Sequence, residues 1–136
     1  MCNITNIKTN RRIGYKVLAY DNNKFYSTFT GQEMKVGKVE EPPFRCKKLS
    51  DYWNTDLDYN LKTCGFYNHN FAGKTSAFID KEEAIYLLNN INKEMFKFTA
   101  ILVKITFGSI TYKGTYHNIP VICSDTIKSI EIIKTE

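Results

Sequence analysis

The chain has 136 residues, of which 43% are hydrophobic, 14% aromatic and 24% charged. This length favours a single domain, and this composition excludes a wholly disordered chain, a collagen-like fibre and a small disulfide scaffold. The N-terminal segment has no apolar stretch of the kind found in signal peptides, and no apolar run approaches the roughly 20 residues that span a bilayer. We therefore expect one soluble cytoplasmic domain over residues 1–136, without a membrane partner.

Charge is unevenly distributed along the chain. Lys and Arg number 19 against 14 Asp and Glu, which gives a net charge of +5. Residues 1–50 hold ten Lys or Arg and four Asp or Glu, whereas residues 51–136 hold nine and ten. A basic field favours anionic partners such as nucleotides, phosphates or nucleic acid. Ordinary solvated lysines are the simpler alternative.

The first forty residues predict a polar arm followed by short strands. Residues 1–12 are polar, and we expect a flexible or loosely docked arm there. Gly14–Tyr20 alternates in the manner of a strand, and Asp21-Asn22-Asn23 has turn chemistry. Phe25–Phe29 would complete a hairpin, and Met34–Val39 is a further short strand.

The middle of the chain predicts a long loop and one helix. Residues 44–62 show no clean period and carry the single Trp, which indicates a lid, a binding loop or a surface insertion. Thr63–Tyr67 is read as a short buried strand or turn. Asp80 can cap a helix over about 81–93, with Glu83 completing a capping box. The apolar stripe at helical spacing consists of Ala84, Leu87, Leu88, Ile91 and Met95.

The last forty residues predict a β-meander. Its expected strands are Phe98–Phe107, Ile110–Tyr112, Thr115–Tyr116, Pro120–Cys123 and Ile127–Ile133, with turns at Gly108-Ser109 and Lys113-Gly114. The whole pattern predicts an α+β fold, in which a twisted, mostly antiparallel sheet has one main helix packed on a face.

Cysteine and histidine offer two candidate catalytic residues. Cys2, Cys46, Cys64 and Cys123 include no C-x-x-C pair, so a zinc ribbon or thioredoxin motif is excluded. Methionine removal would leave Cys2 with both a thiol and an amine, a pair that can act as nucleophile and base. His69 could serve as an acid or base. We expect no metal and no cofactor.

A small nucleotide is the ligand that the residues fit best. Such a site needs aromatic faces for a base, lysines for phosphate and short polar side chains for a ribose. The candidates are Tyr15, Lys16, Tyr26, Ser27, Phe66, Asn68, His69, Lys104, Lys113, Ser124 and Asp125. Polymeric nucleic acid is disfavoured because arginine, the usual residue for phosphate forks and base edges, occurs only three times.

Several motifs in order along nearly the whole chain resemble a family of small phage and mobile-element proteins. They are Met1-Cys2, GYKVL (14–18), FYSTFTG (25–31), MKVGKV (34–39), CGFYNHN (64–70), EEAIYLL (82–88) and YKGTYHNIPVICSDTIKSIEII (112–133). Thr28 and Tyr67 depart from the family's usual Pro and His. The resemblance implies a phage or prophage accessory protein. Small phage proteins of this size often counter host defences, and several bind or degrade the nucleotide messengers of CBASS and Thoeris immunity.

Three functions follow as hypotheses. The first is a protein that binds and sequesters a cyclic or ADP-ribose-type nucleotide in a host bacterial cell, at a pocket or at a homodimer interface. The second is an enzyme that cleaves such a nucleotide with Cys2 or His69. The third is an inhibitor that binds a host defence enzyme directly.

Overall fold

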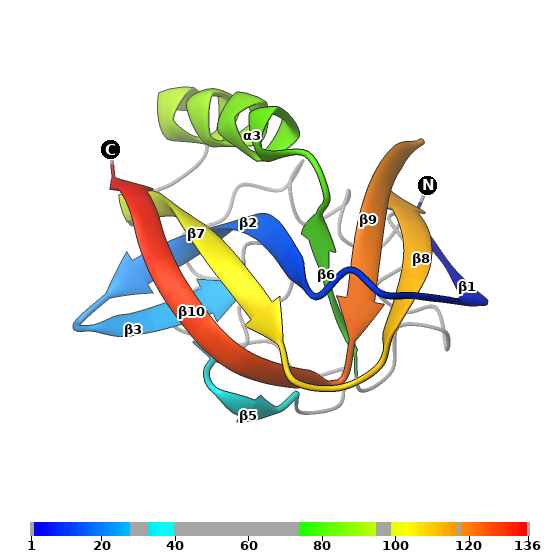
Figure 1. The fold of residues 1–136 in the computed structure, drawn as a ribbon. Coiled ribbons are helices and arrows are strands. Elements are labelled where there is room, and N and C mark those ends of the chain that lie inside the picture. The colour runs from blue at the N-terminus through cyan, green and yellow to red at the C-terminus, as the bar shows by residue number, and fades with distance from the viewer. Residues whose placement is uncertain (1, 28–32, 40–73, 95–98, 117, 136) are drawn as a thin grey trace.

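The computed structural model describes residues 2–27, 33–39, 74–94, 99–116 and 118–135 of the chain. Within these ranges it contains ten strands and one helix, shown in Figure 1. The elements are β1 (Cys2–Thr9), β2 (Ile13–Asp21), β3 (Lys24–Ser27), β4 (Glu33–Met34), β5 (Gly37–Lys38), β6 (Thr75–Phe78), α3 (Lys81–Glu94), β7 (Thr99–Phe107), β8 (Thr111–Tyr116), β9 (Ile119–Ser124) and β10 (Thr126–Thr135).

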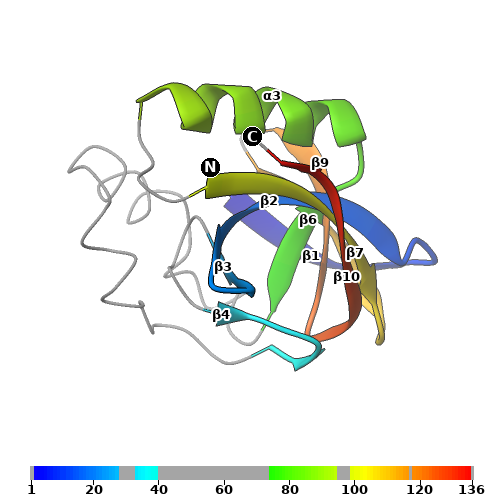
Figure 2. The same ribbon diagram turned by 90° about the vertical axis from the view of Figure 1, so that its left-hand side faces the viewer.

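The described strands form one sheet in which every pairing is antiparallel. Its order is β1-β8-β9-β6-β2-β7-β10-β5, with β3 and β4 attached beside β2. The sheet curves strongly but does not close into a barrel. Helix α3 lies across one face and contacts β2, β6 and β7, as Figure 2 shows from the side. A mostly antiparallel sheet with one helix is compatible with the predicted α+β class.

Two hydrophobic clusters fill the two faces of the sheet because side chains alternate along each strand. The helix-side cluster consists of Val17, Phe78, Ala84, Leu88, Ala100, Leu102, Val121 and Cys123. The second cluster consists of Leu18, Met34, Ala77, Ile101, Val103, Ile105, Phe107, Ile122 and Ile127. The central strands β2 and β7 contribute to both, so they read as nearly continuous apolar runs.

The predicted turn after β2 is confirmed. Asn22 and Asn23 have φ angles of 50° and 63°, and they join β2 to β3 with Asp21 opposite Lys24. Asparagine tolerates this left-handed region better than other non-glycine residues. Two such residues in succession form a hairpin turn whose twist matches that of the flanking strands.

The sheet forks along one edge of β2. This edge pairs with β6 only at Tyr15, which lies opposite Phe78, and with β3 only from Leu18 onward. Lys16 and Val17 lie between these two pairings. The fork is the feature that creates the candidate site described below.

The helix predicted over about 81–93 is confirmed as α3. The Oδ1 atom of Asp80 accepts the backbone N–H of Glu82 at 3.0 Å, and its carbonyl accepts that of Glu83 at 3.2 Å. Ala84 and Leu88 are fully buried against the sheet. The side chains of Ile91 and Met95, which were expected in the same stripe, lie outside the described residues.

The N-terminal residues differ from the predicted flexible arm. Cys2–Thr9 forms β1, which pairs with β8 and has an irregular register between Ile4 and Lys8. The Thr5 hydroxyl donates to the carbonyl of Lys113 at 2.9 Å, and the Thr111 hydroxyl contacts the carbonyls of Thr9 and Arg11. This pairing is made by backbone and hydroxyl groups. Because β1 lacks an alternation of apolar residues, the sequence did not predict it as a strand.

The predicted meander is wrong in its pairing, although its strands exist. Among the strands of the expected meander, only β8 and β9 are both consecutive and paired, whereas β7 pairs with β2 and β10, and β9 pairs with β6. The expected break at Lys113-Gly114 is absent because both residues lie inside β8, where Gly114 is opposite Val121. The register of β10 against β7 is interrupted twice, near Ser129 and near Lys134.

The central part of the chain leaves several predictions without a test. The predicted loop over residues 44–62 and the predicted strand Thr63–Tyr67 lie outside the described residues. Met34–Val39, predicted as one strand, forms parts of two very short ones, and β5 pairs with the start of β10. Gly37 has a φ of 120°, a backbone conformation that favours glycine at the start of β5.

Candidate functional site

The fork between β2 and β6 opens into a small hollow, which we call the fork pocket. Its lining includes Lys16 and Val17 of β2, Ser76 and Phe78 of β6, Tyr116 of β8 and Leu87 of α3. The hollow is open to solvent, and its enclosed part, of about 20 Å³, has room for about one water molecule. A larger ligand would therefore lie across its mouth.

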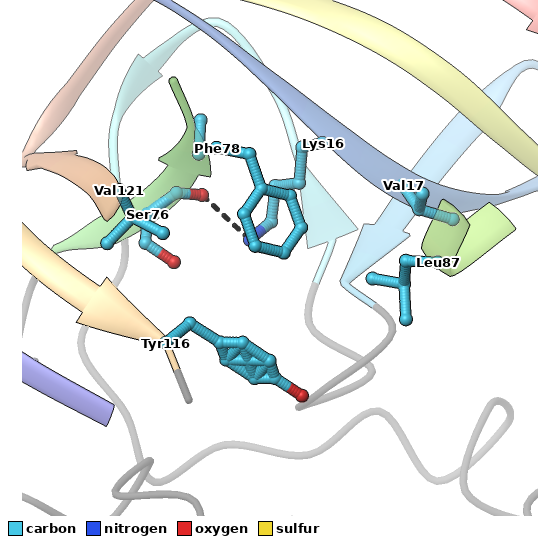
Figure 3. Close-up of a pocket in the computed structure, with 8 residues that line it drawn as sticks. Lys16, Val17, Ser76, Phe78, Leu87, Tyr116 and Val121 are labelled. Atoms are coloured by element: carbon cyan, nitrogen blue, oxygen red, sulfur yellow. Dashed lines mark hydrogen bonds between the residues drawn. The ribbon is translucent and has the colours of Figure 1, made fainter. Parts of the chain in front are cut away.

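Lys16 supplies a positive charge at the fork. Its side chain is only 6% exposed, and its Nζ donates a hydrogen bond to the carbonyl of Ser76 at 2.8 Å, drawn as a dashed line in Figure 3. The ammonium thus bridges the two strands where the sheet has separated. A lysine is rarely so buried without a partner, so this contact helps to hold the fork in place.

Two aromatic rings line the same pocket. The rings of Phe78 and Tyr116 have centroids 5.9 Å apart and an interplanar angle of 63°, in an edge-to-face arrangement. Figure 3 shows Phe78 beside the Lys16 side chain, with Tyr116 on the opposite side of the opening. Aromatic faces next to a lysine form a surface that suits a flat anionic ligand.

A second lysine, Lys74, lies over the ring of Tyr112, outside the residues that line the pocket. The Lys74 ammonium is 5.9 Å from the ring centroid of Tyr112, on the strand that also carries Tyr116. Cys123 lies on β9, between β6 and β8, where it is opposite Ser76 on one side and Tyr112 on the other. Burial raises the pKa of the Cys123 thiol to about 12, and the charges of Lys16 and Lys74 act against this rise. Cys123 is therefore an unreactive packing residue at neutral pH.

Of the residues predicted to bind a nucleotide, Lys16 is the one that the described structure places in the lining of the fork pocket. Tyr15, its neighbour in β2, packs against the helix-side cluster. Tyr26 and Ser27 lie on β3, opposite Ala19 and Leu18. These β3 residues follow the fork on the same edge of β2 and are not part of the pocket lining.

The two predicted phosphate-binding lysines outside β2 also lie elsewhere. Lys104 forms a surface ion pair with Glu131, with 3.3 Å between Nζ and Oε2. Lys113 is exposed on β8. An exposed ion pair of this kind contributes little to stability, so Lys104 is a solvated residue of the sheet surface.

Ser124 and Asp125 belong to a hydrogen-bonded turn. The Ser109 hydroxyl donates to Asp125 Oδ1 at 2.6 Å and lies 2.7 Å from the hydroxyl of buried Ser124. The Thr126 hydroxyl donates to the same carboxylate oxygen at 3.0 Å. The hydrogen bond from Ser109 is the main cause of a lowered pKa at Asp125. This cluster ties the turn after β7 to the turn before β10, which is a structural role.

The two predicted catalytic residues are described only in part. Phe66, Asn68 and His69 lie outside the described residues. The backbone of Cys2 lies in β1 directly opposite Tyr116, a residue of the fork pocket, while the Cys2 side chain is outside the described part. The start of the chain therefore runs next to the candidate site.

Sequence reasoning missed most of the pocket. Phe78 and Tyr116, which line it, were not among the predicted ligand residues. One signal was available, because Tyr112 and Tyr116 are four apart and share a face once β8 is read as one unbroken strand. The short apolar run Ala77-Phe78-Ile79 before the Asp80 cap could also have indicated β6.

Comparisons with known proteins identify no relative of this chain. No protein-family model matches the chain, and no significant match was found among curated proteins or solved structures. In the part of the chain that the structure describes, no helix is long and apolar enough to cross a membrane. Within those same ranges, no cluster of three or more His, Cys, Asp or Glu side chains is arranged to hold a metal ion.

Proposed function

We propose that the protein binds and sequesters a small nucleotide at the mouth of the fork pocket. The observation that carries this proposal is a nearly buried lysine, Lys16, lining a hollow together with the rings of Phe78 and Tyr116. A nucleotide offers what such a lining can recognise, namely a flat base and an anionic phosphate. The described residues that line the pocket include no carboxylate that would repel the phosphate.

The chemistry of recognition divides between the two kinds of side chain. The half-buried ring of Tyr116 can contact a base, because it lines the pocket and is only partly covered by its packing against the helix-side cluster. The ammonium of Lys16 can donate to a phosphate oxygen while it remains near the Ser76 carbonyl, since it carries three N–H donors. Charge-assisted hydrogen bonds of this kind are about twice as strong as neutral ones.

The biological role that we propose combines this site with the resemblance to small phage proteins. Such a protein would act in the cytoplasm of an infected bacterium and would lower the concentration of a cyclic or ADP-ribose-type immune messenger. Sequestration needs no catalytic group and no cofactor. A homodimer could enclose more of the ligand than one subunit does.

Isothermal titration calorimetry against a nucleotide panel tests the proposal. The panel contains ADP-ribose, NAD, 3′,5′-cyclic AMP and 3′,3′-cyclic di-AMP, titrated into the full chain at micromolar concentration. We expect saturable binding of at least one member, and Lys16→Met should weaken it by at least about tenfold, as expected for loss of a charge-assisted hydrogen bond. Absence of heat with every member would refute nucleotide binding.

Matched variants separate loss of the site from loss of the fold. Lys128→Met removes the same charge from an exposed position on β10 and should leave the affinity unchanged. Tyr116→Leu provides a second pocket variant if Lys16→Met does not fold, and thermal unfolding of each variant is measured beside the titration. If the wild type and both folded pocket variants bind the nucleotide with equal affinity, the binding site lies elsewhere on the protein.

Cleavage of the nucleotide is a second candidate function, favoured by the position of the Cys2 backbone opposite Tyr116. After incubation, the protein is denatured by heat and the released nucleotide is analysed by chromatography. Intact nucleotide indicates a binding protein, whereas a product that disappears in the Cys2→Ala variant assigns a nucleophilic role to Cys2. Product that persists in this variant would exclude that role.

A further inference from the structure

One half of the sheet carries positive charge and no negative charge. Strands β1, β8, β9 and β6 are neighbours in the sheet (Figure 1), and within their described bounds they contain no Asp or Glu. By contrast, β1 carries Lys8, β8 carries Lys113, and Lys74 directly precedes β6. A surface with this distribution of charge favours an anionic partner.

Two half-buried tyrosine rings lie on the helix-side face of this half-sheet. Tyr112 and Tyr116 both pack against the helix-side cluster, and each keeps part of its ring in contact with solvent. They are four residues apart on β8, so their side chains share a face and their Cα atoms are separated by about 13 Å along the strand. A single base is too short to contact both rings, whereas a chain of nucleotides can place one base on each.

Lysines adjoin the ring of Tyr112 on this face. The Nζ of half-buried Lys74 lies 5.9 Å from the ring centroid. Exposed Lys8 lies directly opposite Tyr112 on β1, a pairing that places two Cβ atoms about 4.5–5.5 Å apart on the same face of a sheet. Surfaces that bind single-stranded nucleic acid combine these two kinds of side chain, because rings stack on bases and ammonium groups attract phosphates. We call Tyr112 and Tyr116, together with these two lysines, the tyrosine face.

We propose that the tyrosine face binds a short single-stranded oligonucleotide. This proposal rests on the proposed function, because Tyr116 also lines the fork pocket, and it extends the ligand from one nucleotide to several. One base contacts Tyr116 at the mouth of the pocket, and a later base contacts Tyr112. The scarcity of arginine does not oppose this mode of binding, because stacking on rings and attraction to lysines bind a single strand without reading its base edges.

Fluorescence anisotropy of the full chain with a labelled single strand of about eight deoxythymidines tests the proposal. We expect the strand to bind at least about tenfold more tightly than dTMP, because a second base gains a ring. Its affinity should fall about tenfold between about 50 and 200 mM NaCl, as the release of counterions by two or three lysines predicts. Poly-L-glutamate, which has the charge but no bases, should not displace it.

The outcomes separate this proposal from the proposed function. A strand that binds no more tightly than dTMP, or that poly-L-glutamate displaces equally well, would overturn the tyrosine face as an oligonucleotide site. If the strand fails to bind while a nucleotide of the calorimetric panel binds, this proposal alone is wrong. Binding of the strand without binding of any single nucleotide would support the tyrosine face and refute sequestration of a small nucleotide.

Two pairs of matched variants locate the binding site on the tyrosine face. Tyr112→Leu should weaken binding of the strand about tenfold, whereas Tyr20→Leu, which changes a half-buried tyrosine packed against the second cluster, should leave it unchanged. Lys8→Met should weaken binding and reduce its salt dependence, whereas Lys113→Met, on the opposite face of β8, should preserve both. The exposed lysines provide the test if Tyr112→Leu does not fold. Wild-type affinity in folded Tyr112→Leu, or equal effects of the two lysine variants, would contradict the proposal.

Discussion

Gly14 is the residue that sets how closely β2 approaches β6 before the sheet forks. A Cβ atom at this position would lie 2.6 Å from the Cβ of Ala77 and 3.1 Å from the carbonyl oxygen of Phe78. Contacts this short must be relieved by moving backbone, so we expect Gly14→Ala to destabilise the protein by about 1–3 kcal/mol in urea unfolding.

Gly108→Ala is the matched control for this substitution. Its added Cβ would meet nothing closer than 3.4 Å, at the Cγ2 of Thr126, and its backbone is not in the left-handed region. We expect a change within about 1 kcal/mol, since the loss of unfolded-state entropy favours alanine here. Equal effects of the two substitutions would contradict the close approach at the fork.

Asp125 gives the stability a specific dependence on pH. Its pKa is lowered from the ordinary value of 3.8, mainly by the hydroxyl of Ser109 and further by that of Thr126. The carboxylate therefore stabilises the fold above the pKa of the unfolded chain, and this contribution is lost as the pH falls through the lower, folded-state pKa. We expect the difference in unfolding free energy between wild type and Asp125→Asn to shrink below about pH 4.

Urea unfolding between pH 7 and pH 2.5 measures this difference. Glu33→Gln, a change of the same charge at an exposed position on β4, serves as the control for net charge. A constant gap between wild type and Asp125→Asn across the range would mean that the Ser109 hydrogen bond does not favour the charged form.

At the level of single residues, the sequence predicted the chemistry of the site better than its location. Lys16 was recognised as a phosphate candidate, and it lines the pocket. Phe78 and Tyr116 were missed because their proximity depends on β6 and β8 lying on either side of β9, a long-range pairing that no local pattern encodes. Lys104 was a reasonable candidate by type, yet Glu131 lies opposite it on β10.

Helix α3 is the element whose start is most clearly defined by one side chain. Removing the Asp80 carboxylate leaves the backbone N–H of Glu82 without its acceptor at the end of the helix. We expect Asp80→Ala to cost about 1 kcal/mol of unfolding free energy, and Asp80→Asn only a few tenths, because asparagine is an equally good N-cap. Thermal or urea unfolding of the two variants measures the contrast, and equal losses would show that the cap contributes nothing.

Elements with local signals were predicted, and elements defined by their partners were not. The cap and apolar stripe of α3, the alternation of β2 and the asparagine turn after it are all encoded within a few residues. By contrast, β1 exists because β8 offers it unpaired backbone groups, and the pairing of β7 with β2 and β10 is decided by the curvature of the whole sheet. The glycine in Lys113-Gly114 suggested a turn, yet Gly114 is buried inside β8, where β1 and β9 flank it.

The whole molecule depends on β1 to complete one end of the sheet. A variant lacking residues 2–9 would leave the outer edge of β8 unpaired and remove the Thr9 carbonyl that accepts the Thr111 hydroxyl. We expect a loss of at least about 2 kcal/mol in urea unfolding, since several hydrogen bonds of about 0.5–1.5 kcal/mol each disappear. Thr5→Ala, which removes only one of these bonds, should cause a much smaller loss. Unchanged stability of the deletion variant would instead support the flexible arm predicted from the sequence.

The irregular registers of β1 and β10 have a consequence for how the molecule behaves among its own copies. A straight outer strand is a template on which another chain can be laid down and extended into a fibre. At one end of the described sheet β1 is interrupted between Ile4 and Lys8. At the other end β10, which β5 pairs only at Thr126 and Ile127, is interrupted twice along its pairing with β7. Each interruption bends the row of exposed amides away from a uniform spacing. We therefore expect a chain built largely of strands to resist edge-to-edge polymerisation when it is concentrated.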